Sequence, residues 1–192
     1  MKVIALNGSP RRGGNTSRLL QMVLNQLEAE GIQTELIEMA GGRLRGCMAC
    51  FVCKDKKNGQ CVIQDDPLNG WIKKMQEADG IILGSPTYFS NVTSEMKALI
   101  DRAGIVARAN GDFLKRKVAA AVVAVRRAGA IPTFDAINHF FLIEQMIVVG
   151  SSYWNVGVGR AEGEVENDAE GVETMQTLGR NMAWLLQKTH CF

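Results

Sequence analysis

The sequence predicts an α/β fold in which a parallel sheet is covered by helices on both faces. Short apolar segments alternate with amphipathic helical segments along the 192 residues. Five apolar segments have the length of strands, and the helices between them indicate right-handed crossovers that join parallel strands. A glycine-rich loop joins the first strand to the first helix, and such a junction is where these folds hold anions.

The first half of the chain carries three of the expected strands, at residues 3–6, 32–38 and 78–85. Two helices are expected between them, at residues 16–30 and 67–77. The first has its leucines and a valine on one face, and Gly31 ends it. The second has Pro67 near its start, where proline is favoured. Residues 41–66 show no regular period and contain four of the five cysteines.

The second half continues the alternation with strands at residues 117–125 and 146–150. Helices are expected at residues 93–107, 132–145 and 168–187. The run from Thr93 to Glu95 is of the type that caps a helix N-terminus. The acidic residues of 162–173 indicate a solvated loop that leads into the last helix. No interdomain linker or repeat is present, so we expect one domain over residues 1–192.

The composition is that of an ordinary globular protein, with 46% hydrophobic and 22% charged residues. The net charge of +2 gives no reason to expect a nucleic acid or a membrane surface as partner. No apolar run has transmembrane length, and the first strand begins within two residues of the N-terminus without a signal peptide. We therefore expect a cytoplasmic protein, whose cysteines stay reduced and are available for metal or redox chemistry.

The loop after the first strand has the composition of a phosphate site. Glycines at positions 8, 13 and 14 allow a close approach of the backbone to an anion, and the helix start supplies free N–H groups. Polar or charged side chains that can bind the phosphate are Ser9, Arg11, Arg12, Asn15, Thr16 and Ser17. In the plainer interpretation, one of the last three only caps the helix. A single cap does not account for four polar residues beside two arginines and three glycines.

This loop differs from the two common nucleotide loops. Gly14 and Asn15 stand where a nucleotide hydrolase needs Lys followed by Ser or Thr, which argues against ATP or GTP hydrolysis. Pro10 stands where the dinucleotide fingerprint needs its second glycine. What remains suits a terminal phosphate monoester such as that of FMN.

Two further loops follow strands at the same edge of the predicted sheet. Residues 85–93 combine two aromatic side chains with small hydroxyl residues, so that a planar ring can lie against them. Residues 126–130 place Arg126, Arg127 and Gly129 near the polar edge of such a ring. For residues 85–93 the alternative is a surface loop whose Tyr88 and Phe89 cover the core. For residues 126–130 the alternative is a solvated turn.

The cysteines are spaced for a metal centre. Cys47, Cys50 and Cys53 follow each other at two-residue spacings, and Cys61 comes seven residues later. Four thiolates suit a 4Fe–4S cluster, which we favour over a structural zinc, because zinc sites more often pair two separated Cys-x-x-Cys hairpins. A metal-free set of redox-active thiols is the third interpretation. Cys191 lies outside this spacing, near the chain end.

Together these motifs resemble the NADPH-dependent FMN reductase family of the flavodoxin-like fold, and within it the iron–sulfur flavoproteins. The resemblance rests on residues 8–17, 84–92 and 126–130 and on the four cysteines. It implies a three-layer fold around a five-stranded parallel sheet of order 2-1-3-4-5. It also implies that the first loop holds the FMN phosphate and that the other two approach the ribityl chain and ring. The implied cofactor residues are Ser9, Arg11, Asn15, Thr16, Ser17, Pro86, Thr87, Tyr88, Phe89, Ser90, Asn91, Arg126 and Gly129.

The function that follows is electron transfer by FMN and an iron–sulfur cluster, with no side chain needed as catalytic acid or base. The donor is expected to be NAD(P)H or a ferredoxin, and the acceptor a small molecule or a protein. One alternative is a cluster-free NAD(P)H-dependent FMN or quinone reductase, and another is a flavodoxin-like binding module with a structural zinc. The resemblance further implies a homodimer or homotetramer. Met48, Phe51 and Val52 lie between the cysteines and would be poorly covered in a monomer, so we expect them to pack against a second subunit. The alternative is a monomer in which this loop folds back on its own domain.

Overall fold

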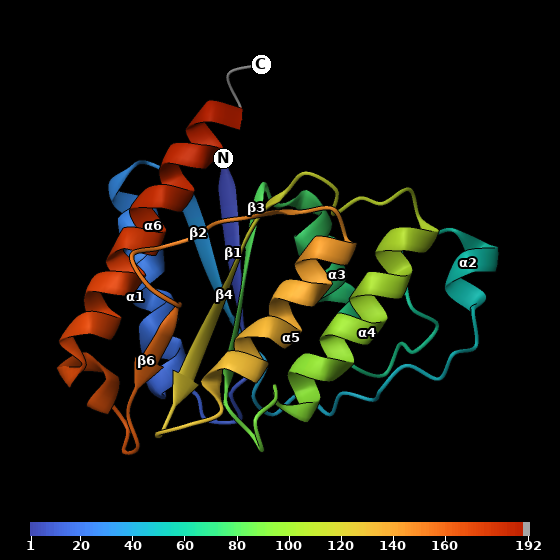
Figure 1. Ribbon diagram of the computed structural model, residues 1–192. Helices are drawn as coiled ribbons and strands as arrows, with labels where there is room; N and C mark the ends of the chain where they lie inside the picture. The colour runs from blue at the N-terminus through green and yellow to red at the C-terminus, as the bar shows by residue number, and fades with distance from the viewer. Residues whose placement is uncertain (190–192) are drawn as a thin grey trace.

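A computed structural model of the chain describes residues 1–189, which form a twisted sheet between two layers of helices (Figure 1). In chain order the elements are β1 (Lys2–Asn7), α1 (Asn15–Ala29), β2 (Gln33–Glu38), α2 (Val52–Lys56), α3 (Leu68–Glu77), β3 (Gly80–Pro86), α4 (Ser94–Ala109), β4 (Val118–Val125), α5 (Ala130–Ile143), β5 (Ile147–Val148), β6 (Val156–Val158), the 3₁₀ helix η1 (Glu164–Asn167) and α6 (Ala169–Thr189).

The strand order β2-β1-β3-β4-β5 confirms the predicted topology, and the strand pairs are parallel. Successive residues of β1 enter opposite cores, because side chains alternate across a strand. Ile4 and Leu6 join the core under α3, α4 and α5, whereas Val3 and Ala5 join the core under α1 and α6. The sheet is therefore buried on both faces, as its apolar strands predict.

The sheet has six strands, and the prediction of five is wrong at one edge. The strand expected at residues 146–150 is only Ile147–Val148, which pairs with the start of β4. The chain then leaves the sheet and returns as β6, which pairs with the end of β4. A segment of three residues with a glycine in its middle is too short for a recognisable alternation, so the sequence gives no strand signal there.

Asn155 bridges the gap between the two edge strands. Its side chain is buried, and its Nδ2 atom donates to the carbonyl of Ala121 at 3.0 Å. The backbone of Asn155 in turn accepts from Val123 N at 2.9 Å. A side-chain amide thus satisfies a carbonyl of β4 that a continuous fifth strand would otherwise pair.

Two segments expected to be irregular contain short helices. The cysteine segment 41–66 includes α2, and the acidic segment 162–173 includes η1, whose Val165 is fully buried. The predicted ends of the other helices all lie within two residues of the observed ends. Among residues 1–189, no helix combines the length and apolarity that crossing a bilayer requires.

Glu144, just after α5, is a buried carboxyl that we expect to make stability depend on pH. It is 3% exposed, and its Oε2 atom has no hydrogen-bond partner among the described residues. Burial raises its pKa from 4.5 to about 7, with Arg108 opposing and Asp112 reinforcing the shift. The folded state therefore holds this proton more tightly than the unfolded chain does, and stability falls as pH rises from about 4.5 through 7.

Glu144→Gln tests this expectation, because the amide stays neutral. Urea unfolding at pH 8 should find the variant more stable than the parent protein by up to about 3 kcal/mol, the linkage value of the shift. At pH 4, below both pKa values, the two should be nearly equal. Glu170→Gln, at an exposed position in the first turn of α6, is the control. Equal pH dependence in the parent and the Glu144 variant would contradict the assignment.

Candidate functional site

A cavity of about 370 Å³ opens where the parallel strands end, at the lower edge of the sheet in Figure 1. Loops after β1, β3, β4 and β6 surround it. Its lining residues are Ser9, Arg11, Gly14, Asn15, Thr16, Pro86, Thr87, Tyr88, Ala124, Val125, Arg126, Gly159, Arg160 and Glu162. All three loops that the sequence predicts to form one site therefore contribute to it, together with a fourth that the prediction missed.

The loop after β1 leaves the N-terminus of α1 without a side-chain cap. The N-cap residue is Gly14, which has no side chain to accept a hydrogen bond from the first turn. The N–H groups of this turn have no carbonyl partner within the helix, and they carry the positive end of its dipole. Because Gly14, Asn15 and Thr16 line the cavity, these groups are available to an anion bound there. Helix capping, the plainer interpretation of this loop, is not observed.

Ser17 lies beneath the loop rather than in the cavity. Its Oγ atom donates to Glu38 Oε1 at 2.6 Å. The other oxygen of Glu38 accepts from Asn7 Nδ2 at 2.8 Å, and Asn7 Oδ1 accepts from Ser9 N at 2.9 Å. These bonds connect the ends of β1 and β2 and fix the start of the loop. The structure thus gives Ser17 a place in the support of the loop, whereas Ser9, Arg11, Asn15 and Thr16 line the cavity.

The loop after β6 forms the side of the cavity that the sequence analysis missed. Asn15 holds it with two side-chain hydrogen bonds, one to the carbonyl of Ala161 and one from Gly163 N, both 2.8 Å long. A Cβ atom at Gly159 would lie 2.7 Å from the nitrogen of Val165, so that only glycine fits there. The signal for this loop was present in the sequence, since a second glycine-rich run ends in Arg160 just after an apolar segment.

Charges of both signs come from this fourth loop. Arg160 and Glu162 line the cavity, and Glu162 also forms an ion pair with Arg18 at 3.6 Å. Glu164 accepts from the backbone of Arg160 and Ala161, and these hydrogen bonds lower the pKa of its carboxyl group. The loop is therefore fixed by its own acidic residues.

The loop after β3 divides between the cavity and the surface. Pro86, Thr87 and Tyr88 line the cavity. Tyr88 and Asn91 pair with each other across a two-residue turn, and the turn residues Phe89 and Ser90 both have positive φ angles, as in a type I′ turn. Phe89, Ser90 and Asn91 are exposed, with Phe89 fully so, and they do not line the cavity.

The loop after β4 contributes one arginine directly. Arg126 lines the cavity, whereas Gly129 does not. Gly129 is the N-cap of α5 with φ of 84°, and a Cβ atom there would lie 2.6 Å from Ser90 Oγ. Its backbone therefore packs against the turn after β3, a close contact that only glycine permits. Thr133 adds a second link, donating to Thr87 at 3.3 Å.

The four clustered cysteines line a second, small cavity of about 20 Å³. It lies between α2 and Ile105, in the C-terminal half of α4. Cys47 and Cys50 are exposed, Cys61 is half-buried and Cys53 is buried. Between them, Ala49 and Phe51 have positive φ angles. Such angles are uncommon for residues other than glycine. They occur here in the segment where Cys47, Cys50 and Cys53, each separated by two residues from the next, all line one cavity.

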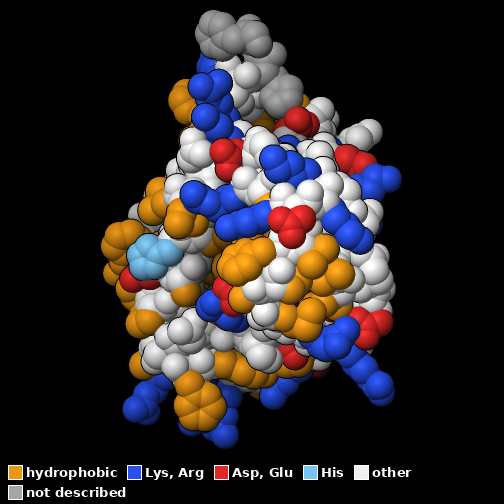
Figure 2. All heavy atoms as spheres, turned by 90° about the vertical axis from the view of Figure 1, so that its right-hand side faces the viewer, with side chains coloured by type: hydrophobic (Ala, Val, Ile, Leu, Met, Phe, Trp, Pro, Cys, Tyr) orange, Lys and Arg blue, Asp and Glu red, His pale blue; other side chains and the backbone are white. Residues whose placement is uncertain are grey.

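The polar side chains of two helices hold the cysteine segment in place. Asn69 of α3 accepts from Cys61 N at 2.8 Å and donates to the Cys61 and Ile63 carbonyls at 3.0 Å. Asn110, after α4, accepts from Gly59 N at 2.8 Å. The segment therefore folds onto its own domain, and Figure 2, which faces it, shows hydrophobic side chains gathered among lysines and arginines.

The thiols are close enough to affect each other. Burial raises the pKa of the Cys53 thiol, and the neighbouring Cys61 and Cys50 sulfurs add to this effect. Within residues 1–189, however, no three His, Cys, Asp or Glu side chains are grouped tightly enough to hold a single metal ion. The prediction about Cys191 lies outside the described residues.

Known proteins resemble this chain in sequence and in fold. The chain is 45% identical to an iron-sulfur flavoprotein of Methanocaldococcus jannaschii over 190 residues, which are 95% of this chain and 96% of that protein. An iron-sulfur flavoprotein of Methanosarcina thermophila is 32% identical over 97% and 96% of the two chains. A solved flavone reductase aligns with a TM-score of 0.72 at 18% identity, over 99% of this chain and 64% of that one. An archaeal flavodoxin aligns with a TM-score of 0.64 at 16% identity, over 97% of this chain and 99% of that one.

The doubly wound parallel sheet of order β2-β1-β3-β4-β5 places the chain in the flavodoxin-like class of α/β folds. Residues 1–161 match the NADPH-dependent FMN reductase family. The chain belongs to this family, and it is a flavin-dependent oxidoreductase.

Proposed function

We propose that this protein binds FMN in the cavity at the sheet edge and transfers electrons through a 4Fe–4S cluster held by Cys47, Cys50, Cys53 and Cys61. The observation that carries the proposal is the convergence of four separated cysteines on one cavity in a member of a flavin reductase family. The names of the relatives, iron-sulfur flavoproteins, support the same assignment.

The lining of the larger cavity fits FMN. The uncapped start of α1, with Ser9, Arg11, Asn15 and Thr16, offers donors and positive charge to one phosphate. The segment from Pro86 to Tyr88 and the side chain of Arg126 would border the rest of the cofactor. The bound flavin ring supplies the redox chemistry, while these residues bind and orient it.

The cysteine cavity fits a cluster better than a zinc ion. A zinc site needs four sulfurs about 2.3 Å from one point, and no such group is present among the described residues. In a 4Fe–4S cluster each thiolate binds a separate iron, so the sulfurs stand further apart. The cavity of about 20 Å³ would have to widen for this, and Cys47 and Cys50 are the cysteines at its exposed side.

Anaerobic purification followed by three measurements tests the function. The visible spectrum should show flavin bands with a broad iron–sulfur shoulder, heat should release FMN identified by its mass, and iron should accompany acid-labile sulfide. Flavin without iron would favour the cluster-free NAD(P)H-dependent reductase. About one zinc per chain without iron would favour the structural-zinc module. Reduction by NADPH, NADH or a reduced ferredoxin would then identify the donor.

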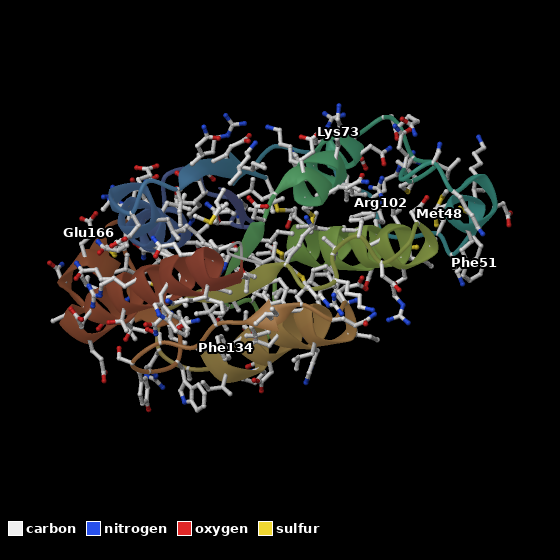
Figure 3. All side chains as sticks on the ribbon, turned by 90° about the horizontal axis from the view of Figure 1, so that it is seen from above. Met48, Phe51, Lys73, Arg102, Phe134 and Glu166 are labelled. Carbon is white, nitrogen blue, oxygen red and sulfur yellow. The ribbon has the colours of Figure 1, made fainter. Side chains whose placement is uncertain are left out.

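We further propose that a second subunit completes the electron path. No described residue lines both cavities. In Figure 1 the loops around the first lie at the lower edge of the sheet, whereas α2, beside the second, lies at the right-hand end of the domain. Next to the cysteines, Met48 and Phe51 are 58% and 47% exposed, and Figure 3 shows both at the outer end of the molecule. Burying them against another copy would shield the cluster from water and bring it near that copy's flavin.

Phe51→Glu should weaken assembly and slow flavin-to-cluster electron transfer together, because a charge cannot be buried at an apolar contact without a large cost. Light scattering at micromolar concentration measures assembly, and stopped-flow reduction measures transfer. Phe89→Glu, at a fully exposed phenylalanine on the loop after β3, is the control. A parent protein that is strictly monomeric would defeat the model. Loss of assembly with unchanged transfer would place the path within one subunit.

A further inference from the structure

Arg102 is a buried cation in the middle of α4 that the predicted site does not include. Its side chain is fully buried, and so is that of its partner Asp66, at 0% and 1% exposure. A buried charge is costly unless it is paired and hydrogen-bonded, so its retention in a helix interior needs a reason. Figure 3 shows Arg102 lying between α4 and the segment that carries Met48, which is the cysteine segment.

The guanidinium group has five N–H donors, and each has a partner in or beside the cysteine segment. Its two terminal nitrogens bind both carboxylate oxygens of Asp66 and the carbonyls of Arg45 and Ile63. The remaining donor, Nε, points to Cys61 Sγ at 3.3 Å. One side chain thus fastens the chain two residues before Cys47, the chain after Cys61, and one cysteine sulfur itself.

The charge of Arg102 is secured by the same contacts. A guanidinium group stays protonated in proteins, and both carboxylate oxygens of Asp66 accept hydrogen bonds from its terminal nitrogens. A permanent positive charge therefore lies within hydrogen-bond distance of one of the four sulfurs. Hydrogen bonds and charges at the sulfurs are among the factors that set the reduction potential of an iron–sulfur cluster.

We propose that Arg102 is the positioning residue of the cysteine centre, fixing Cys61 for ligation and raising the reduction potential of the cluster through its Nε–H···Sγ bond. This inference rests on the proposed function, since it requires the cluster. Lysine cannot replace Arg102, because it has three donors at one point and cannot serve Asp66, two carbonyls and the sulfur together.

The test compares three variants of the anaerobically prepared full chain. Arg102→Gln with Asp66→Asn removes both charges, so no buried charge is left unpaired. Arg102→Lys keeps the charge but loses the Nε donor. Arg108→Gln is the control, because Arg108 lies on the same helix and donates instead to the carbonyl of Ile143. FMN content reports folding, a chelator reports the rate of iron loss, and an EPR-monitored redox titration reports the cluster potential.

We expect FMN to be retained in all three variants. The double variant should lose iron several-fold faster and have a lower cluster potential, and Arg102→Lys should shift both in the same direction. Loss of the cluster from Arg102→Lys with FMN retained would also support the positioning role. Parent-like iron loss and potential in both Arg102 variants would overturn it, and so would an equal shift in Arg108→Gln. A parent protein without iron would instead refute the cluster itself, so the two failures are distinguishable.

Discussion

Replacing Cys50 by serine should remove most of the iron from the anaerobically prepared protein, whereas replacing Cys191 should remove none. Cys50 lies at the centre of the compact motif and lines the same cavity as Cys47, Cys53 and Cys61. A serine hydroxyl is a poor ligand for iron in a thiolate site. The loss in metal retention should exceed the roughly 10- to 100-fold that removal of an outer-shell partner costs.

Iron, acid-labile sulfide and the broad visible shoulder should fall in parallel in the Cys50 variant, while FMN content stays unchanged. FMN should be retained because the flavin cavity and the cysteine cavity have no lining residue in common among those described. Retained FMN would also show that the variant is folded. Equal iron loss in the Cys50 and Cys191 variants would contradict the ligand assignment. Full iron in both would show that the cluster does not depend on this motif.

The fold could be predicted from sequence wherever an element is long and its apolar pattern is regular. The strand β4 is eight residues of Val and Ala, and α1 carries its leucines on one face, so both were recognisable. The prediction failed for β6, which is three residues long and pairs with the end of β4 beyond the point where Asn155 bridges the interrupted edge. That pairing depends on a contact between distant parts of the chain, which local pattern does not contain.

The candidate site, like the fold, was predictable in part. Glycines and polar residues after apolar strands located three of its loops, because carboxyl ends of parallel strands share one edge. The orientation of single side chains was not predictable. Phe89 and Ser90 occupy a turn that usually takes Asn and Gly, so nothing in their identity indicates that they point away from the cavity. The burial of Arg102 was not predictable, because an arginine in an amphipathic helix is ordinarily exposed.

The second large effect is expected at Asn15 and Thr16, whose replacement should weaken the binding of FMN. Both line the FMN cavity at the start of α1, and Asn15 also holds the loop of Ala161 and Gly163 against it. Their combined replacement by alanine should weaken FMN binding by about 3 kcal/mol, or roughly a hundred-fold, as expected for two hydrogen bonds to a charged phosphate. Fluorescence titration of the flavin-free protein with FMN measures this change.

Ser17→Ala provides the matched control, because its hydroxyl is the next polar group along the same helix turn but donates to Glu38 at 2.6 Å. If the phosphate lies at the uncapped N-terminus of α1, the control should alter FMN affinity far less than the double variant does. A titration with riboflavin, which lacks the phosphate, separates the two contributions further. The double variant should lose little riboflavin affinity if its side chains contact the phosphate. Equal losses for FMN and riboflavin would mean that Asn15 acts by shaping the loop of Ala161 rather than by binding the anion.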